Sequence, residues 1–153
     1  MDGMEEQAGG LELRAPGSTA EWQAVHALRR RALFSGGGYD EKHPDDRDAD
    51  HHVLVLVKDG AVLGTMRIDL SHPAWAAFRL VAVDPDHRGQ GFGGTMLAKA
   101  EAMVSRRGWH QVRLHAKPEA VQFYRRNGYR EVQWSEPPRD PQGLNMGKSL
   151  AAR

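Results

Sequence analysis

The 153-residue chain contains no cysteine. This absence excludes disulfides, thiolate metal sites and a cysteine nucleophile together. It is compatible with a reducing compartment, and we expect a cytoplasmic protein. No apolar run approaches the roughly 20 residues that a membrane-spanning helix needs, and residues 1–10 are acidic and glycine-rich rather than basic and apolar. We therefore expect neither a signal peptide nor a membrane anchor, and we expect residues 1–10 to form a flexible tail.

The chain also lacks an excess of charge of either sign. Its 21 Lys and Arg side chains nearly balance its 20 Asp and Glu side chains, which gives a formal net charge of +1. This balance gives no reason to expect a nucleic-acid partner, although short basic runs occur at 29–31, 106–107 and 125–126. A content of 40% hydrophobic and 27% charged residues is that of a globular protein. The length suits one domain over residues 1–153.

A glycine-rich stretch, 88–94, is the most informative part of the chain, because it joins an apolar run to a helical pattern. Glycine has no Cβ, so we expect Gly89, Gly91 and Gly93 to turn through positive φ and bring several N–H groups towards one anion. The helix that follows adds its unpaired amides and the positive end of its dipole. Arg88 adds a charge that can bind two phosphate oxygens. The alternative is a tight loop whose glycines only permit the turn.

Two well-known phosphate-binding motifs do not fit the spacing of these glycines. The P-loop needs Lys and Ser or Thr directly after its last glycine, whereas Gly93 is followed by Gly94 and Thr95. The Rossmann fingerprint needs a different glycine spacing within a βαβ unit. The stretch instead resembles the Arg/Gln-x-x-Gly-x-Gly/Ala signature of the GNAT superfamily of acyl-CoA-dependent N-acyltransferases, read as Arg88, Gly91 and Gly93.

Two further segments extend the resemblance to about residues 53–150. Residues 79–85 are similar to the family's central strand and its exit turn. Residues 120–129 are similar to its late helix, in which Tyr124 stands four residues before a Gly-aromatic pair. On these blocks the chain is identified as a member of the GNAT superfamily. The resemblance implies an α+β fold, a mixed sheet whose two central parallel strands splay apart.

The periodicity of apolar residues predicts the order of elements along the chain. A polar, mostly acidic segment at 35–50 shows no regular element, and Lys99 is expected on the exposed face of its helix. An Asp59-Gly60 turn should pair the first two strands as an antiparallel hairpin. Helices are expected over 21–34, capped by Ser18 or Thr19, and over 95–107 and 118–127; strands are expected over 53–57, 62–70, 78–83, 112–116, 129–134 and 144–150.

The resemblance implies acetyl-CoA as acyl-donor co-substrate, with its pantetheine paired to the backbone of strand 80–83 like an added strand. An ordinary buried strand would look the same in sequence, because backbone binding leaves no side-chain trace. The family often has Asn seven residues before the helix Tyr; Lys117 stands there instead, either to reach a CoA phosphate or to be solvated. The implied cofactor-binding residues are Leu80, Val81, Ala82, Val83, Arg88, Gly89, Gln90, Gly91, Phe92, Gly93, Gly94 and Thr95.

Acyl transfer from a thioester to an amine needs a neutral amine, a polarised carbonyl and a proton for the departing thiolate. By its position in the motif, Tyr124 is the predicted general acid, because a phenol with a pKa of about 10 is protonated at neutral pH. The adjacent Phe123 is then the packing residue. The alternative makes Tyr124 a core aromatic of an amphipathic helix.

The sequence leaves the general base and the acceptor open. An acidic lid over the acceptor would favour a cationic amine, but a solvated acidic loop is the more common explanation for such a segment. Arg67 and Arg79 are candidates to bind a substrate carboxylate, or to pair with Asp69. Candidate bases are His115, His51, His52, Asp48 and the carboxylates of 39–50; the group Asp48, Asp50, His51 and His52 lacks a recognised ligand spacing, so no metal is expected.

The predicted function is N-acetyl transfer from acetyl-CoA to a primary amine of a small molecule or peptide, directly within a ternary complex. Two alternatives stay open: a longer-chain acyltransferase, and a catalytically silent module that senses acyl-CoA. Neither nucleic acid nor membrane is expected as a partner. Homodimers are common in the family, and the sequence contains no signal for or against a homodimer here.

Overall fold

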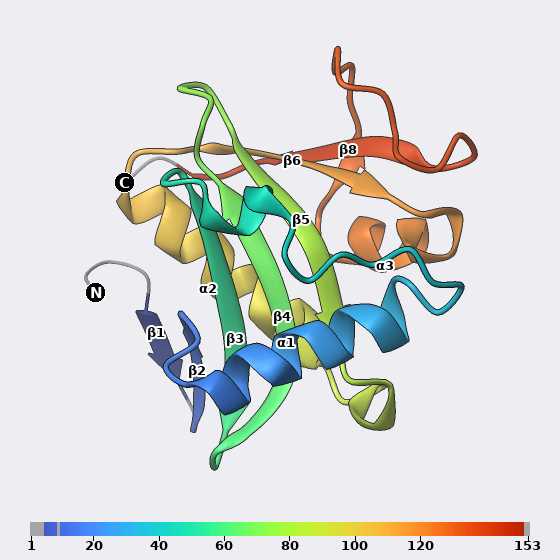
Figure 1. Ribbon diagram of the computed structural model, residues 1–153. Helices are drawn as coiled ribbons and strands as arrows, with labels where there is room; N and C mark the ends of the chain where they lie inside the picture. The colour runs from blue at the N-terminus through green and yellow to red at the C-terminus, as the bar shows by residue number, and fades with distance from the viewer. Residues whose placement is uncertain (1–4, 9, 152–153) are drawn as a thin grey trace.

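The computed structural model describes residues 5–8 and 10–151, which form one mixed sheet covered by helices on both faces (Figure 1). The strand order is β1-β2-β3-β4-β5-β6-β8-β7. β5 and β6 run parallel, and the other neighbouring strands are antiparallel. The strands are β1 (Glu5–Ala8), β2 (Leu11–Arg14), β3 (His51–Lys58), β4 (Ala61–Asp69), β5 (Ala76–Val83), β6 (Gln111–Ala116), β7 (Arg130–Glu131) and β8 (Leu144–Ser149).

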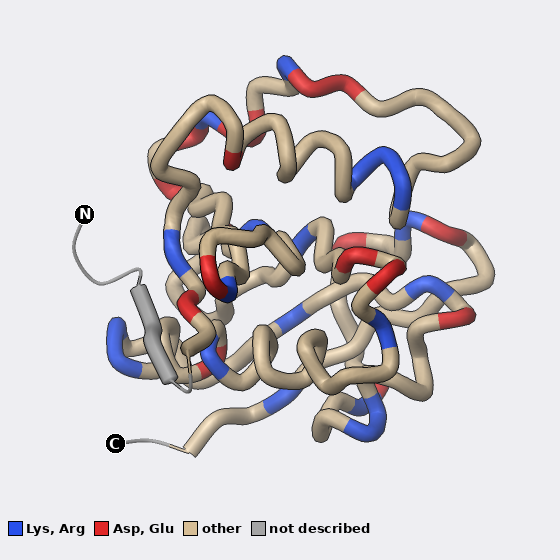
Figure 2. The backbone as a smooth tube through the Cα atoms, turned by 90° about the horizontal axis from the view of Figure 1, so that it is seen from below, with Lys and Arg blue, Asp and Glu red and all other residues tan. Residues whose placement is uncertain are grey.

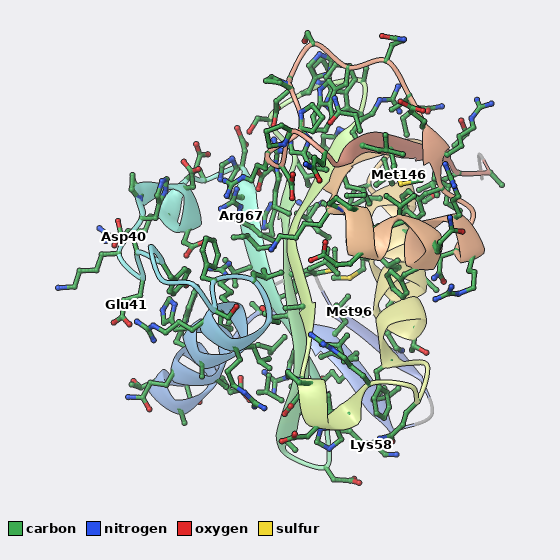
Figure 3. The ribbon with its side chains drawn as sticks, turned by 90° about the vertical axis from the view of Figure 1, so that its right-hand side faces the viewer. Asp40, Glu41, Lys58, Arg67, Met96 and Met146 are labelled. Atoms are coloured by element: carbon green, nitrogen blue, oxygen red, sulfur yellow. The ribbon has the colours of Figure 1, made fainter. Side chains whose placement is uncertain are left out.

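Helix α1 (Thr19–Ala32) covers one face of the sheet, and α2 (Phe92–Arg106) with α3 (Val121–Arg126) covers the other. With the sheet seen edge-on, Asp40, Glu41 and Arg67 lie on the α1 side and Met96 on the α2 side (Figure 3). Alternate β3 residues separate the two cores, because a strand points successive side chains to opposite faces. Val53, Val55 and Val57 pack with Val25 of α1, and Leu54 and Leu56 join the larger α2 core.

Local signals placed several elements correctly. Ser18 caps α1 by accepting a hydrogen bond from the amide of Glu21 at 3.1 Å, as expected of a residue that binds an otherwise unpaired amide. Asp59 and Gly60 both have positive φ, 51° and 82°, which suits the two-residue turn that joins β3 to β4. The α+β class and the predicted antiparallel hairpin are thus confirmed.

The parallel pair β5 and β6 separates soon after it begins. Pairing covers only Ala76 to Phe78 on β5, opposite Val112 to Leu114 on β6. On the other side of β5, the register with β4 shifts between Thr65 and Arg67, and Leu80 has φ of 52°. A positive φ is strained for a leucine and bends the strand away from the regular ladder. The splay between the two parallel strands, expected from the family resemblance, is therefore present.

Several predicted boundaries are corrected by the structure. Glu5–Ala8 forms β1, paired with β2, where a tail was expected; residues 1–4 and 9 lie outside the described residues. The acidic segment contains a 3₁₀ turn at Pro44–Arg47. The strand expected over 129–134 shortens to β7, because the chain leaves the ladder after the Val132 amide bonds to the Asn145 carbonyl at 3.0 Å.

Lys99 was expected to be exposed, but only 6% of its surface is accessible. The reason is that α2 packs against β1 and β2 as well as β4 and β5, so more of its circumference is covered than the apolar pattern indicates. Within 5–8 and 10–151 its Nζ has no hydrogen-bond partner.

No helix in the described part of the chain has the length and apolar character needed to cross a membrane.

Gly93 was expected to adopt positive φ, but it belongs to the first turn of α2, which begins three residues earlier than predicted. Its lack of a side chain instead admits α3: a Cβ there would lie 2.9 Å from Cζ of Phe123. We expect Gly93→Ala to destabilise the protein by about 1–3 kcal/mol in urea unfolding, the usual cost of overpacking. Gly91→Ala is the comparison, because nothing lies within 4 Å of its Cβ position and only φ of 82° opposes it. A Gly93→Ala protein as stable as wild type would contradict this close packing.

Candidate active site

The splay of β5 from β6 opens a cavity of about 490 Å³. One wall is the diverging part of β5 with Leu80 and Val81, and the opposite wall is the end of β6 with Tyr124 of α3. Segments from the end of α1 and from the β7–β8 connection also line it. Its lining residues are Leu33, Phe34, Phe78, Arg79, Leu80, Val81, His115, Ala116, Lys117, Ala120, Tyr124, Arg139, Asp140 and Pro141.

The backbone of β5 faces this cavity because β6 does not pair beyond Phe78. Leu80 and Val81, two of the predicted cofactor-binding residues, line the cavity. Ala82 and Val83 still pair with Thr65 and Gly64 of β4 on the other edge, so their backbones keep one neighbour strand. A left-handed non-glycine residue costs on the order of 1–3 kcal/mol and is held only where surrounding structure enforces it. The strained peptide of Leu80 thus lies at the wall of the cavity.

The glycine loop leads from a 3₁₀ turn at Pro85–His87 into α2. Gly89 and Gly91 have φ of 80° and 82°, and Gly91 is the N-cap of α2 with no side-chain cap hydrogen bond. The first amides of α2 are therefore available at an exposed helix start, beside the exposed side chain of Arg88. The expectation of positive φ is confirmed for Gly89 and Gly91. The arrangement has the donors of an anion site.

Tyr124 lines the cavity and is linked to the glycine loop through its neighbour Phe123. Phe123, which contacts Gly93, packs edge-on against Tyr124 with ring centroids 5.1 Å apart. Tyr124 is 6% exposed, and among the described residues its hydroxyl makes no hydrogen bond. Burial raises the pKa of Tyr124 above its usual value. The phenol is therefore kept protonated throughout the neutral range at the wall of the cavity.

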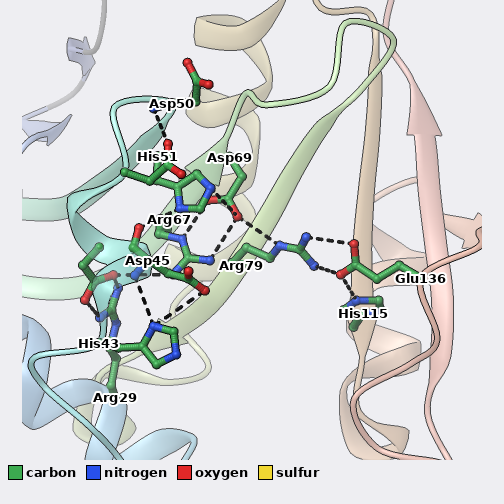
Figure 4. Close-up of polar contacts among 12 residues, drawn as sticks. Arg29, His43, Asp45, Asp50, His51, Arg67, Asp69, Arg79, His115 and Glu136 are labelled. Atoms are coloured by element: carbon green, nitrogen blue, oxygen red, sulfur yellow. Dashed lines mark hydrogen bonds and ion pairs between the residues drawn. The ribbon is translucent and has the colours of Figure 1, made fainter.

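On the α1 side of the sheet, ionised side chains alternate in sign in a continuous chain (Figure 4). Arg29 of α1, which is 1% exposed, holds Asp46 with two contacts of 2.7 and 3.2 Å. Asp46 lies 3.5 Å from Arg67 of β4, which in turn donates to both oxygens of Asp69 at 2.7 and 3.0 Å. Burial acts to raise the pKa of Asp46, but the hydrogen bonds and charge of Arg29 outweigh it and the pKa is lowered.

The same chain continues into the β7–β8 connection, as Figure 4 shows. Asp69 accepts from Nε of Arg79 at 3.2 Å, and Arg79 donates to both oxygens of Glu136 at 2.5 and 3.2 Å. Glu136 also lies 2.7 Å from Nε2 of His115. Burial acts to raise the pKa of Glu136, and the hydrogen bonds from Arg79 and His115 more than reverse this effect. Arg67 and Arg79 are thus occupied by carboxylates of the chain itself, and the structure favours the structural alternative for both.

His115, a candidate base, has both ring nitrogens on acceptors. Its Nδ1 lies 2.6 Å from Oδ1 of Asn145, and the Asn145 amide group donates from Nδ2 to the Glu136 carbonyl, which fixes that orientation. Its Nε2 faces the Glu136 carboxylate. Both ring nitrogens are therefore engaged by groups of the chain itself, and neither is free to contact a substrate amine. The geometry speaks against the role of general base for His115.

The other candidate bases are also engaged or distant. Nδ1 of His51 lies 2.6 Å from the Asp45 carbonyl, and its Nε2 lies 3.5 Å from Asp69. His52 follows on the opposite face of β3, where burial lowers its pKa, and it lines none of the cavities described here. Asp48 accepts a hydrogen bond from the Asp50 amide at 2.9 Å. Among the described residues, no group of three or more His, Cys, Asp or Glu side chains is arranged to hold a metal ion.

The chain's own arginines neutralise two of the six carboxylates of the acidic segment. Asp46 faces Arg29 and Arg67, and Glu41 pairs with Arg30. Positive and negative stretches are interspersed along the tube in Figure 2 rather than gathered on one side. An acidic lid that attracts a cationic amine would therefore depend on the other four carboxylates, Asp40, Asp45, Asp48 and Asp50.

Two further cavities share lining residues with the first. One, of about 540 Å³, shares Arg79 and His115 with it; a smaller one, of about 150 Å³, shares Phe34 and Leu80. Arg139 lines all three cavities, and sequence reasoning did not single it out. Lys117 lines the first cavity and donates to the Leu33 carbonyl at 3.1 Å, which ties the end of β6 to the end of α1.

Comparison with solved structures finds the same fold over nearly the whole chain. A protein from Lactobacillus plantarum assigned as an N-acetyltransferase is 24% identical, with a TM-score of 0.74 over 94% of this chain and 100% of its own. One from Klebsiella pneumoniae subsp. pneumoniae, assigned as an acyl-CoA N-acyltransferase, is 25% identical, with a TM-score of 0.70 over 98% and 100%. An aminoglycoside 6′-N-acetyltransferase, complexed with coenzyme A, is 13% identical with a TM-score of 0.73 over 89% and 94%.

The sequence itself matches a protein family. Residues 49–131 match the acetyltransferase (GNAT) domain, and this match spans the cavity wall of β5, the glycine loop, α2 and Tyr124. It also covers more than half of the chain. The chain therefore belongs to the GNAT family of acyl-CoA N-acyltransferases, as the glycine loop and the tyrosine helix predicted.

Proposed function

We propose that the protein transfers an acetyl group from acetyl-CoA to a primary amine, directly within a ternary complex of enzyme and both substrates. One observation carries the proposal: the splayed strands enclose a cavity with the strained β5 backbone at Leu80 on one wall and the buried phenol of Tyr124 on another. An amide-rich ligand can pair with the first wall, and a leaving thiolate can take a proton from the second.

Acetyl-CoA would bind along β5 and end at α2. Its pantetheine amides would pair with the backbone that β6 leaves free, and its pyrophosphate would accept from the exposed amides at the start of α2. Arg88 would add a charge-assisted contact at the rim. The proposed cofactor-binding residues are Leu80, Val81, Ala82, Val83, Arg88, Gly89, Gln90, Gly91, Phe92, Gly93, Gly94 and Thr95.

The proposed acyl transfer uses both the β5 wall and the Tyr124 wall of the cavity. The amine lone pair attacks the thioester carbonyl carbon, and the oxygen gains negative charge that backbone N–H groups near Leu80 can stabilise. The C–S bond then breaks, the electron pair stays on sulfur, and Tyr124 donates its proton to the thiolate. The amine releases its own proton to solvent, since His115 and His51 are both engaged by groups of the chain itself.

A thiol-release assay tests this function. Acetyl-CoA is supplied with a panel of amino acids, polyamines, aminoglycosides and peptide N-termini, and CoA binding is measured separately by calorimetry. We expect Arg88→Ala to raise the Kd for acetyl-CoA roughly 10- to 100-fold, the loss of one charge-assisted hydrogen bond. Arg130→Ala, which removes an exposed arginine of β7, is the matched control.

The outcome of that assay distinguishes the acetyltransferase from the acyl-CoA sensor and the longer-chain acyltransferase. Release of thiol with an amine supports the acetyltransferase. Binding without release, or release only with longer acyl-CoA donors, supports the sensor or the longer-chain enzyme instead. No binding of acetyl-CoA would overturn the proposal.

A further inference from the structure

We propose that Arg139 binds a carboxylate of the acceptor, so that the acceptor is an amine that also carries a carboxylate, such as a free amino acid. This inference rests on the proposed function, because it places the acceptor in the cavities next to the acyl-CoA cavity. It assigns a ligand group to a residue of the β7–β8 connection.

Arg139 differs from the other arginines of these cavities in its ion pairs. Four arginines line the cavities on the acceptor side of the cleft: Arg29, Arg67, Arg79 and Arg139. The first three are held by Asp46, Asp69 and Glu136 in the alternating chain. Arg139 is exposed and has no hydrogen-bond or ion-pair partner among the described residues. It is therefore the arginine of this group whose fork of donors is available to a substrate.

Its place fits the reaction. Arg139 lines the acyl-CoA cavity and both cavities beside it. Leu80, where the acyl carbonyl would be polarised, lines the first cavity and the smallest one. A carboxylate bound by Arg139 would bring the amine of the same small molecule to the junction of these cavities, next to the thioester carbon.

The chain holds the segment around Arg139 from both sides. On one side, Glu136 is bound by Arg79 and His115, and its carbonyl accepts from Asn145. The ring of Trp134 stacks on His115 with centroids 4.6 Å apart. On the other side, the Gly143 amide donates to the Asp140 carbonyl at 2.8 Å. Anchored ends reduce the ordering cost of binding, which favours a binding role for the side chain between them.

The same cavities contain groups suited to an ammonium. Asp40 and Asp45 line the smallest cavity, and neither pairs with an arginine or lysine among the described residues. Asp40 accepts from the Lys42 amide, and Asp45 lies 3.7 Å from His43. Arg139 and these two carboxylates together complement a molecule with an ammonium and a carboxylate. A diamine would instead place a second cation beside Arg139.

Matched acceptor pairs test the inference. Alanine, lysine and phenylalanine are each compared with their primary amides and with the amines that lack the carboxylate, by thiol release from acetyl-CoA. We expect kcat/KM to be at least about tenfold higher for the free acids, the value of one charge-assisted contact. Arg139→Gln should abolish this preference by lowering kcat/KM for the acids alone, and Arg139→Lys should restore part of it.

The controls separate this inference from the proposed function. The Kd for acetyl-CoA should be the same in wild type, Arg139→Gln and the control Arg130→Gln. Equal or better turnover of the amides and amines, or an equal loss on all acceptors in Arg139→Gln, would overturn the inference while leaving the acetyltransferase intact. If no acceptor releases thiol, calorimetric binding of the amino acids to the CoA complex decides: binding lost in Arg139→Gln supports the carboxylate site, and no binding refutes it.

Discussion

Replacing Tyr124 by phenylalanine will lower kcat about 100-fold and leave the Kd for acetyl-CoA within about a factor of two, because general acid catalysis contributes roughly 10²–10⁴-fold. Phenylalanine fills almost the same volume in the core formed with Phe123 and Tyr129. The substitution therefore removes a proton donor and little packing. Steady-state thiol release and calorimetry measure the two quantities separately.

Burial changes the proton affinity of both partners in the proposed proton transfer, the donor Tyr124 and the departing thiolate that accepts. It raises the pKa of the phenol, which taken alone makes Tyr124 a weaker acid. In the proposed reaction, however, the departing thiolate would be desolvated in the same cleft, and burial raises the proton affinity of a thiolate too. The proton transfer therefore depends on the difference in pKa between two buried groups, and not on the difference between the same groups in water. The raised pKa also keeps Tyr124 protonated, so we expect no alkaline loss of activity from this residue near neutral pH.

Tyr129→Phe is the matched control for this prediction. Tyr129 is also buried, and its hydroxyl donates to Glu101 at 2.8 Å, but it does not line the cavity between β5 and β6. Losing that hydrogen bond should cost stability of about 1 kcal/mol and leave kcat near the wild-type value. Equal turnover in Tyr124→Phe and wild type would remove the general-acid assignment and return Tyr124 to the role of a core aromatic.

Local signals explain why the binding loop and the tyrosine helix could be predicted. Gly89 and Gly91 have positive φ in the structure, and this requirement acts within a few residues of sequence. Ser18 caps its helix for an equally local reason. For Gly93 the sequence analysis predicted a positive φ, which was wrong. A side chain is excluded there by the ring of Phe123, thirty residues further along the chain. A glycine required by packing and one required by conformation look the same in sequence.

The proposed acceptor side could not be predicted, because its contacts join distant segments. Glu136 meets Arg79 across 57 positions and His115 across 21. The sequence left Arg67 and Arg79 open between a substrate carboxylate and Asp69, because nothing local decides between these partners, and Arg139 was overlooked. The strained φ of Leu80 is invisible for the same reason: the leucine side chain gives no sign of the backbone conformation that tertiary structure imposes.

Replacing Arg67 by methionine will destabilise the protein by about 3–5 kcal/mol at pH 7, the usual result of removing one partner from a buried ion pair. Arg67 is 6% exposed and stands between Asp46 and Asp69, both of which are also nearly buried. Methionine retains much of the volume, so the loss comes mainly from two carboxylates that each lose a positive neighbour. Urea unfolding measures it, with Arg47→Met as an exposed control expected to change stability by less than about 0.5 kcal/mol.

Two tests distinguish this loss from simple packing. Asp69→Asn in the Arg67→Met background should cost less than the two single changes added together, because the carboxylate left without its main partner is gone. The deficit should also shrink in acid. The folded pKa of Asp46 is lowered, so its stabilising contribution is present above its unfolded pKa of about 4 and is lost as the pH falls through the folded value. An additive double mutant with a pH-independent deficit would show that the alternating chain contributes through shape rather than charge, and the two segments it ties to the sheet would then need another anchor.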